Sequence, residues 1–219
     1  MRRLQKTAIP PVLEANAAAW LNDYLAEPTS DTKKYRYRDK SIKAALLTET
    51  GSKCVYCESK IGHNTPGDVE HKVPTSKVRE QHFEWSNLTI ACTECNRRKA
   101  TYYEVDTAFL DPYHDDVEQC LVHLGPLVYS RSGHIRAEKT IRKLALDSME
   151  RKGLIDRKTD VLEKARALIT NVKSAEDPLL KALREDELAR MKRVDAEYSA
   201  MVIAYLDADD DRPKPPREA

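Results

Sequence analysis

Residues 91–99 read ACTECNRRK, in which Cys92 and Cys95 lie three positions apart. An earlier pair with the same spacing is formed by Cys54 and Cys57. Four thiolates in two CxxC pairs suit the tetrahedral coordination of zinc. An iron–sulfur site is one alternative, and a redox site would usually need only a single CxxC pair. The spacing therefore predicts a structural Zn²⁺ bound by Cys54, Cys57, Cys92 and Cys95.

The segment between the two cysteine pairs, residues 58–91, is longer than the loop of a simple zinc ribbon, so further structure is expected inside it. VEHKVP predicts a short strand that carries Glu70 and His71, and NLTIAC predicts a second strand that begins after Asn87. CNRRKATYY then predicts a helix with Asn96 in its first turn. The expected order is strand, strand, helix.

This order, with an acid–histidine pair on the first strand and an asparagine at the helix start, resembles the HNH (ββα-metal) endonuclease motif. His71 stands at the first histidine position, Asn87 at the central asparagine and Asn96 at the final position. The residue before the first histidine is often Asp in this family and is Glu70 here. The resemblance implies phosphodiester hydrolysis with these four residues as the catalytic set. It also implies that Asn87 acts through hydrogen bonds that hold the loop and orient the histidine.

Hydrolysis of a phosphodiester needs an activated water and relief of negative charge at the phosphate. A single Mg²⁺ or Mn²⁺ meets the second need, and it prefers oxygen ligands such as those of Glu70 and Asn96. Asp68 is the alternative carboxylate for this metal. An imidazole titrates near neutral pH, so His71 can accept the proton of the water. The basic residues after Asn96 are predicted to bind flanking phosphates, with solvated helix charge as the alternative: Arg97, Arg98 and Lys99.

Motifs on either side of this unit are similar to those of one branch of the HNH family. KCVYCESKIG, FLDPYHDDVEQCL and TIRKLALDSMERKGLIDRK are similar to segments of the PtuB nuclease subunits of Septu anti-phage systems and of retron-linked relatives. Asp147 stands where such proteins often have Asn. The resemblance implies antiviral defence, with the nuclease held in check until infection by an ATPase partner of the PtuA type. The chain has no GxxxxGK[ST] motif, so a nucleotide switch would have to come from that partner.

The composition indicates a globular chain of 219 residues, with 41% hydrophobic and 33% charged residues. The net charge is +1, but residues 30–100 hold 14 Lys and Arg against 9 Asp and Glu. That local surplus favours a polyanion such as nucleic acid, although a mixed surface is an equal alternative. No apolar run is long enough to cross a membrane, and the N-terminus lacks the apolar region of a signal peptide. We expect a cytoplasmic protein.

Outside the cysteine-rich module the pattern is mainly helical. Ser41 is expected to cap the second of the predicted helices, Gly153 is expected to end the third, and a hairpin is expected to turn at Ser132–Gly133. KKYRYRDK, residues 33–40, interleaves basic and aromatic residues in a pattern that can bind phosphates and stack bases, or can form a solvated connector. The expected helices cover residues 11–26, 41–50, 137–153, 155–173 and 176–208. The last of these has an apolar stripe suited to a helical partner, either within this chain or from another chain.

The fold class that follows is α+β, mainly α with a small zinc-bracketed ββα-metal module. The predicted divisions are an N-terminal helical segment, the nuclease module, a mostly helical region and a disordered tail, at residues 1–50, 51–104, 105–206 and 207–219. The predicted function is a metal-dependent endonuclease, with DNA favoured as the substrate. The alternatives are an effector that cleaves RNA or tRNA, a non-catalytic zinc module that binds nucleic acid, and a homing or restriction enzyme.

Overall fold

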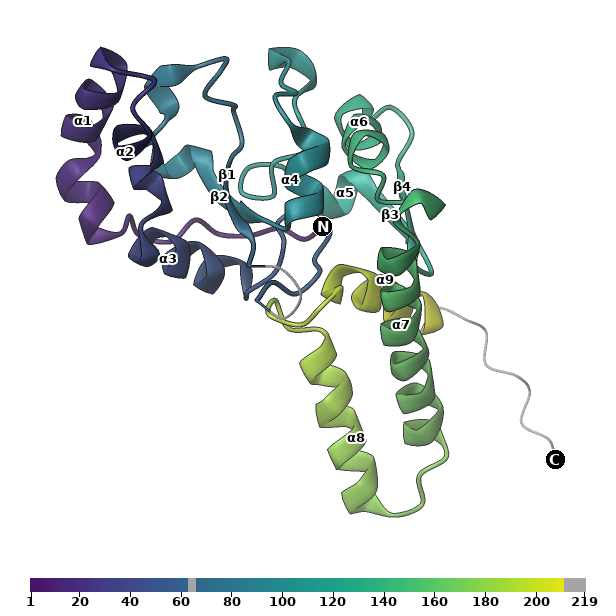
Figure 1. Cartoon of the computed structure of the whole chain (residues 1–219). Helices are drawn as coiled ribbons and strands as arrows, with labels where there is room; N and C mark the ends of the chain where they lie inside the picture. Colours follow the sequence, from purple (N-terminus) through teal and green to yellow (C-terminus); the bar gives the residue numbers. More distant parts are fainter. Residues whose placement is uncertain (63–65, 211–219) are drawn as a thin grey trace.

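The computed structural model describes residues 1–62 and 66–210 and begins with a helical layer (Figure 1). Helix α1 spans Pro11–Ala26, as predicted, and prolines occupy its start, where a missing N–H costs nothing. Helix α2 (Asp31–Lys34) and the 3-10 helix η1 (Tyr35–Arg38) follow. Helix α3 (Lys40–Thr50) is capped by Asp39, whose carboxylate accepts from Ser41 N at 2.8 Å, so the prediction of a Ser41 cap was wrong.

The centre of the fold is the predicted strand–strand–helix unit. Strand β1 (Asp68–His71) pairs antiparallel with β2 (Leu88–Ala91), and His71 lies opposite Leu88. Every residue of β2 is buried, because helix α3 packs against it. Helix α4 (Thr93–Lys99) starts immediately after Cys92 and packs against β1. The hairpin and the helix therefore bring the acid–histidine pair and Asn96 to one place.

A second hairpin and helix follow this unit. Helix α5 (Val117–Cys120) leads into β3 (Leu121–Leu124), which pairs antiparallel with β4 (Leu127–Ser130). The hairpin turns at Gly125–Pro126 and not at Ser132–Gly133, because Gly125 takes up the left-handed backbone (φ 60°) that this tight turn needs. The Ser–Gly pair leads instead into α6 (Ile135–Leu144). Short 3-10 helices lie at Arg79–Gln81, Trp85–Asn87, Val105–Thr107 and Met149–Arg151.

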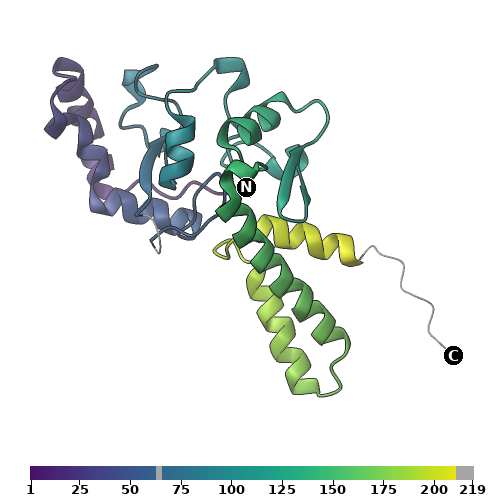
Figure 2. The same cartoon turned by 45° about the vertical axis from the view of Figure 1, so that its right-hand side comes forward.

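The last helices break differently from the prediction. The helix expected over residues 137–153 ends at Leu144, where Ala145 adopts a positive φ of 50°, and Gly153 lies in the first turn of α7 (Lys152–Lys173) rather than at a helix end. The single helix expected over 176–208 is two helices, α8 (Pro178–Met191) and α9 (Ser199–Asp210). Figures 1 and 2 show α7 and α8 as an antiparallel pair that projects from the body of the molecule.

The first residues of the chain form hydrogen bonds to two distant segments, one before α5 and one between α8 and α9. Residues before α1 form neither helix nor strand, and Leu4 N donates to Pro112 O at 2.9 Å. Arg2 donates to Lys192 O at 2.6 Å, in the segment between α8 and α9. Of the predicted disordered tail, residues 207–210 belong to α9, and the rest lies outside the described residues. Within the described part of the chain, no helix has the length and apolar character to span a membrane.

Candidate active site

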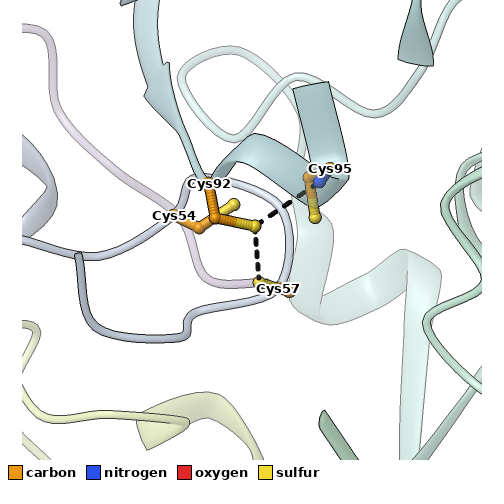
Figure 3. Close-up of side chains that lie close together, drawn as sticks. All are labelled: Cys54, Cys57, Cys92 and Cys95. Atoms are coloured by element: carbon orange, nitrogen blue, oxygen red, sulfur yellow. Dashed lines mark hydrogen bonds between the residues drawn. The ribbon is translucent and has the colours of Figure 1, made fainter. Parts of the chain in front are cut away.

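Four cysteine side chains meet beside the first turn of α4. The Sγ atoms of Cys54, Cys57, Cys92 and Cys95 all lie within 4.8 Å of one another, and all four residues are buried (Figure 3). The Cys57 and Cys92 Sγ atoms are 3.8 Å apart, which matches the edge of about 3.8 Å expected for a tetrahedron with Zn–S bonds of about 2.3 Å. The four thiols therefore form a site that fits Zn²⁺, as the spacing predicts.

Groups from the C-terminal region surround this cluster. Arg151, in the segment before α7, donates from Nη1 to Cys95 Sγ at 3.3 Å. Lys158 of α7 is buried close enough to Cys57 for their charges to interact. The Ser59 hydroxyl lies 3.2 Å from Cys57 Sγ and also hydrogen-bonds to the Tyr198 hydroxyl at 2.9 Å. A Zn²⁺ with four thiolates carries a formal charge of −2, so nearby buried cations stabilise it.

His71, at the end of β1, is held by a backbone acceptor. Its Nε2 lies 2.8 Å from His82 O, and because a carbonyl can only accept, Nε2 carries the hydrogen. The lone pair of the neutral ring is then on Nδ1. Burial lowers the pKa of His71 to about 3, so the ring is neutral at neutral pH. Nδ1 is therefore the ring atom at which a proton can be accepted, and the low pKa makes it a weak base.

His82 is part of this site, although no motif in the sequence singles it out. Its ring stacks on His71 with centroids 4.8 Å apart and on Tyr24 at 4.2 Å. His82 Nε2 donates to Lys34 O at 2.7 Å, and this bond ties the ring to the start of η1. Tyr37 of η1 packs its edge against His71 at 4.5 Å. No local pattern signals these contacts, since they join segments that are far apart in the sequence.

Asn87 spans the loop that joins His71 to β2. Its Oδ1 accepts from Val73 N at 2.7 Å, and its Nδ2 donates to Val73 O at 3.0 Å and to Gln81 O at 3.1 Å. The side chain is buried, so these bonds are shielded from water. Asn87 thus fixes both the start and the end of the loop whose His82 carbonyl receives the His71 hydrogen.

Oxygen-bearing side chains line the same pocket as His71. Asn96 Nδ2 donates to Asp68 Oδ2 at 3.1 Å, and the Glu70 carboxylate pairs with Lys99 Nζ at 2.5 Å. The Lys99 ammonium also donates to His71 O at 2.8 Å. A pocket of about 560 Å³ is lined by all of the residues of this cluster: Asp68, Glu70, His71, Asn96 and Lys99. Its carboxylate and amide oxygens are of the kind that Mg²⁺ and Mn²⁺ prefer.

The three basic residues of α4 are placed differently from one another. Arg97 is exposed but forms two hydrogen bonds with Glu94, at 2.8 and 2.9 Å. Arg98 is bound to Glu94 at 2.6 Å and to Glu150 at 3.2 Å. Lys99 is only 2% exposed and pairs with Glu70, and its contact with a flanking phosphate stays a prediction. Lys99 lines the pocket, whereas the lining of that pocket includes neither arginine.

Comparison with known proteins identifies this unit. Residues 54–101 match the model of the HNH endonuclease family. Septu protein PtuB from Bacillus mycoides (strain KBAB4) is 25% identical over 189 residues, which cover 68% of this chain and 64% of that protein. Septu protein PtuB from Bacillus thuringiensis is 29% identical over 112 residues, covering 50% of this chain and 42% of that protein. The chain thus spans less than two thirds of these relatives, and within it residues 54–101 form an HNH endonuclease domain.

Proposed function

We propose that this chain is a metal-dependent nuclease that hydrolyses phosphodiester bonds, with DNA as the favoured substrate. The observation that carries the proposal is one pocket that holds a neutral, oriented histidine beside Asp68, Glu70 and Asn96. A zinc module that only binds nucleic acid would need the cysteines and the basic residues, but would have no use for this arrangement.

The proposed roles follow from these contacts. His71 removes a proton from the attacking water at Nδ1, because Nε2 is engaged by His82 O. Asn87 holds the loop that supplies this carbonyl. Glu70, Asp68 and Asn96 would hold Mg²⁺ or Mn²⁺, which when bound supplies positive charge at the phosphate and the leaving oxygen. Zn²⁺ at the four cysteines would fix the start of α4 and thereby the position of Asn96.

The biological setting is also a proposal. The similarity to PtuB supports a role in anti-phage defence in the cytoplasm, together with an ATPase partner of the PtuA type. Helix α8 offers a surface for such a partner, because it leaves apolar side chains exposed after packing on α7: Leu179, Leu180 and Leu183.

Cleavage by the purified protein tests the function. Plasmid DNA and bulk tRNA would be incubated in parallel with Mg²⁺ or Mn²⁺, with His71→Ala as the control. We expect cutting of DNA that needs the metal and falls by about 10²-fold or more in the variant, because a general base contributes that much. Cutting of tRNA alone would reassign the substrate, and activity of the variant within tenfold of the unsubstituted chain would place the base elsewhere.

A further inference from the structure

The pocket that contains His71 has a second wall, which comes from the N-terminal helical layer. Tyr37 and Arg38 of η1 and Lys43 of α3 line it, opposite the carboxylates of β1. Tyr37 is buried with its ring centroid 4.5 Å from that of His71 in a T-shaped arrangement, and the Arg38 guanidinium lies 5.7 Å from the centre of Tyr37. Tyr37 is therefore a neighbour of both the candidate base and this guanidinium.

The guanidinium of Arg38 is oriented but not neutralised. It lies over the Tyr35 ring at 4.1 Å and also interacts with the Tyr37 hydroxyl, so two neutral tyrosines order the side chain and leave its charge uncompensated. Arg38 is exposed and forms no ion pair with any residue in the described part of the chain. Lys43 likewise uses its ammonium for a backbone acceptor, Gly67 O at 2.8 Å, and not for a carboxylate.

The arginines of α4 provide the contrast. Glu94 binds both Arg97 and Arg98, and Glu150 binds Arg98 a second time. A phosphate would have to compete with these carboxylates for either guanidinium. At Arg38 no such competition arises, and a free, planar guanidinium fits a phosphate with two parallel hydrogen bonds.

We propose that Arg38 binds a phosphate of the substrate strand next to the bond that is cut, so that η1 forms one side of the nucleic-acid channel. This inference rests on the proposed nuclease function. The His82–Lys34 hydrogen bond keeps the distance between this phosphate site and His71 fixed, because the same His82 residue provides the carbonyl that orients His71. Arg38 thus sets where along the strand the scissile phosphate comes to lie.

Binding measurements on the full chain test the proposal. A fluorescein-labelled DNA duplex and a labelled tRNA would be titrated without added Mg²⁺ or Mn²⁺ and without a chelator, so that no cleavage occurs and the structural zinc is kept, over a series of salt concentrations. The variants are Arg38→Ala, Arg38→Lys and Arg190→Ala. Arg190 is a matched control for charge, since it is exposed on α8 and pairs with Asp186 far from the pocket.

We expect Arg38→Ala to weaken binding by about five- to tenfold near 0.1 M salt and to lower the salt dependence by about one released counterion. Arg38→Lys should keep the salt dependence but recover only part of the affinity, because an ammonium cannot form the paired hydrogen bonds. Arg190→Ala should bind like the unsubstituted chain. In cleavage assays with metal, Arg38→Ala should raise KM more than it lowers kcat.

Equal binding by Arg38→Ala and Arg190→Ala would overturn the proposal, as would a loss of binding in Arg97→Ala that Arg38→Ala does not show. If cutting still depends on His71 in either case, the nuclease function stands and only the assignment of Arg38 fails. If the unsubstituted chain neither binds nor cuts DNA or tRNA, the proposed function fails together with this inference.

Discussion

The hydrogen bond between His71 Nε2 and His82 O selects the nitrogen that can act as a base. The backbone carbonyl accepts, so the tautomer is fixed without a second ionisable group. The stacked His82 ring and the Tyr37 edge prevent the imidazole from turning. At this position the environment, and not the histidine itself, determines the protonation state.

The buried ion pair of Glu70 and Lys99 leads to a prediction for metal binding. Lys99→Met leaves a buried carboxylate without its cation, so we expect the free energy of unfolding to fall by about 3 kcal/mol without metal. Mn²⁺ supplies a positive charge in the same pocket, so it should raise the melting temperature more in the variant than in the unsubstituted chain. Differential scanning fluorimetry with and without Mn²⁺ measures both effects.

Lys139→Met is the control for this prediction, because Lys139 pairs with Glu104 at the surface. It should change neither the stability nor the response to Mn²⁺ appreciably. An identical rise in melting temperature for the unsubstituted chain and Lys99→Met would show that Glu70 does not bind the metal.

At the residue scale, the sequence motif was sufficient to predict that the acid–histidine pair and Asn96 lie close together, because spacing on a strand and a helix turn is local information. The structure brings these residues into one pocket. The second wall of the pocket was not predictable as such. The pattern KKYRYRDK is one that can bind phosphates. Its proximity to His71 arises from the packing of Tyr37 against that ring, and no local spacing encodes this contact.

Among the elements, the loop between β1 and β2 depends on Asn87. Asn87→Ala removes three hydrogen bonds and leaves partly buried backbone groups of Val73 and Gln81 unsatisfied. We expect a loss of about 3 kcal/mol in the free energy of unfolding by urea, together with reduced cleavage. Asn171→Ala, at an exposed position of α7, is the matched control and should leave both unchanged. Stability equal to that of this control would exclude the structural role of Asn87.

Helix limits were predictable where a proline or glycine sets them, and were not predictable where a tertiary contact does. Prolines define the start of α1, and Gly51, with φ of 62°, ends α3 after Thr50, the predicted last residue of that helix. The breaks at Ala145 and Tyr198 use positive φ at residues that rarely adopt it. Tyr198 is buried with its hydroxyl on Ser59, beside the cysteine cluster, so a tertiary contact holds the break. The apolar periodicity of residues 176–208 continues through this break, so it does not predict that the helix is interrupted.

For the whole molecule, the cysteine cluster joins the N-terminal and C-terminal parts of the fold. Cys92→Ser should abolish zinc binding and unfold the nuclease module, because structural zinc contributes folding free energy directly. Zinc content by mass spectrometry and thermal unfolding measure this. Cys120→Ser, outside the cluster, is the control and should keep both. Equal zinc content in the two variants would rule out this site.

Arg151 provides a second test of the link between the cysteine cluster and the C-terminal part of the fold. Arg151→Gln removes the cation that donates to Cys95 Sγ, so a chelator should extract zinc about tenfold faster, as is usual when a group around a metal site is lost. Arg151→Lys should restore part of the retention. Arg142→Gln, an exposed arginine of α6 that pairs with Glu138, should release zinc at the original rate. Equal rates for Arg151→Gln and this control would contradict the role of Arg151.

The contact between Arg151 and Cys95 also matters while the protein is being made. Arg151 follows Cys95 by 56 residues, which a ribosome adds in roughly 3 to 11 seconds at typical bacterial speeds. During that interval the four thiolates can capture zinc, but the cation that neutralises them has not yet been synthesised. Tyr198, which braces the first cysteine turn, emerges later still. A chain cut short by a stalled ribosome would therefore hold its metal weakly.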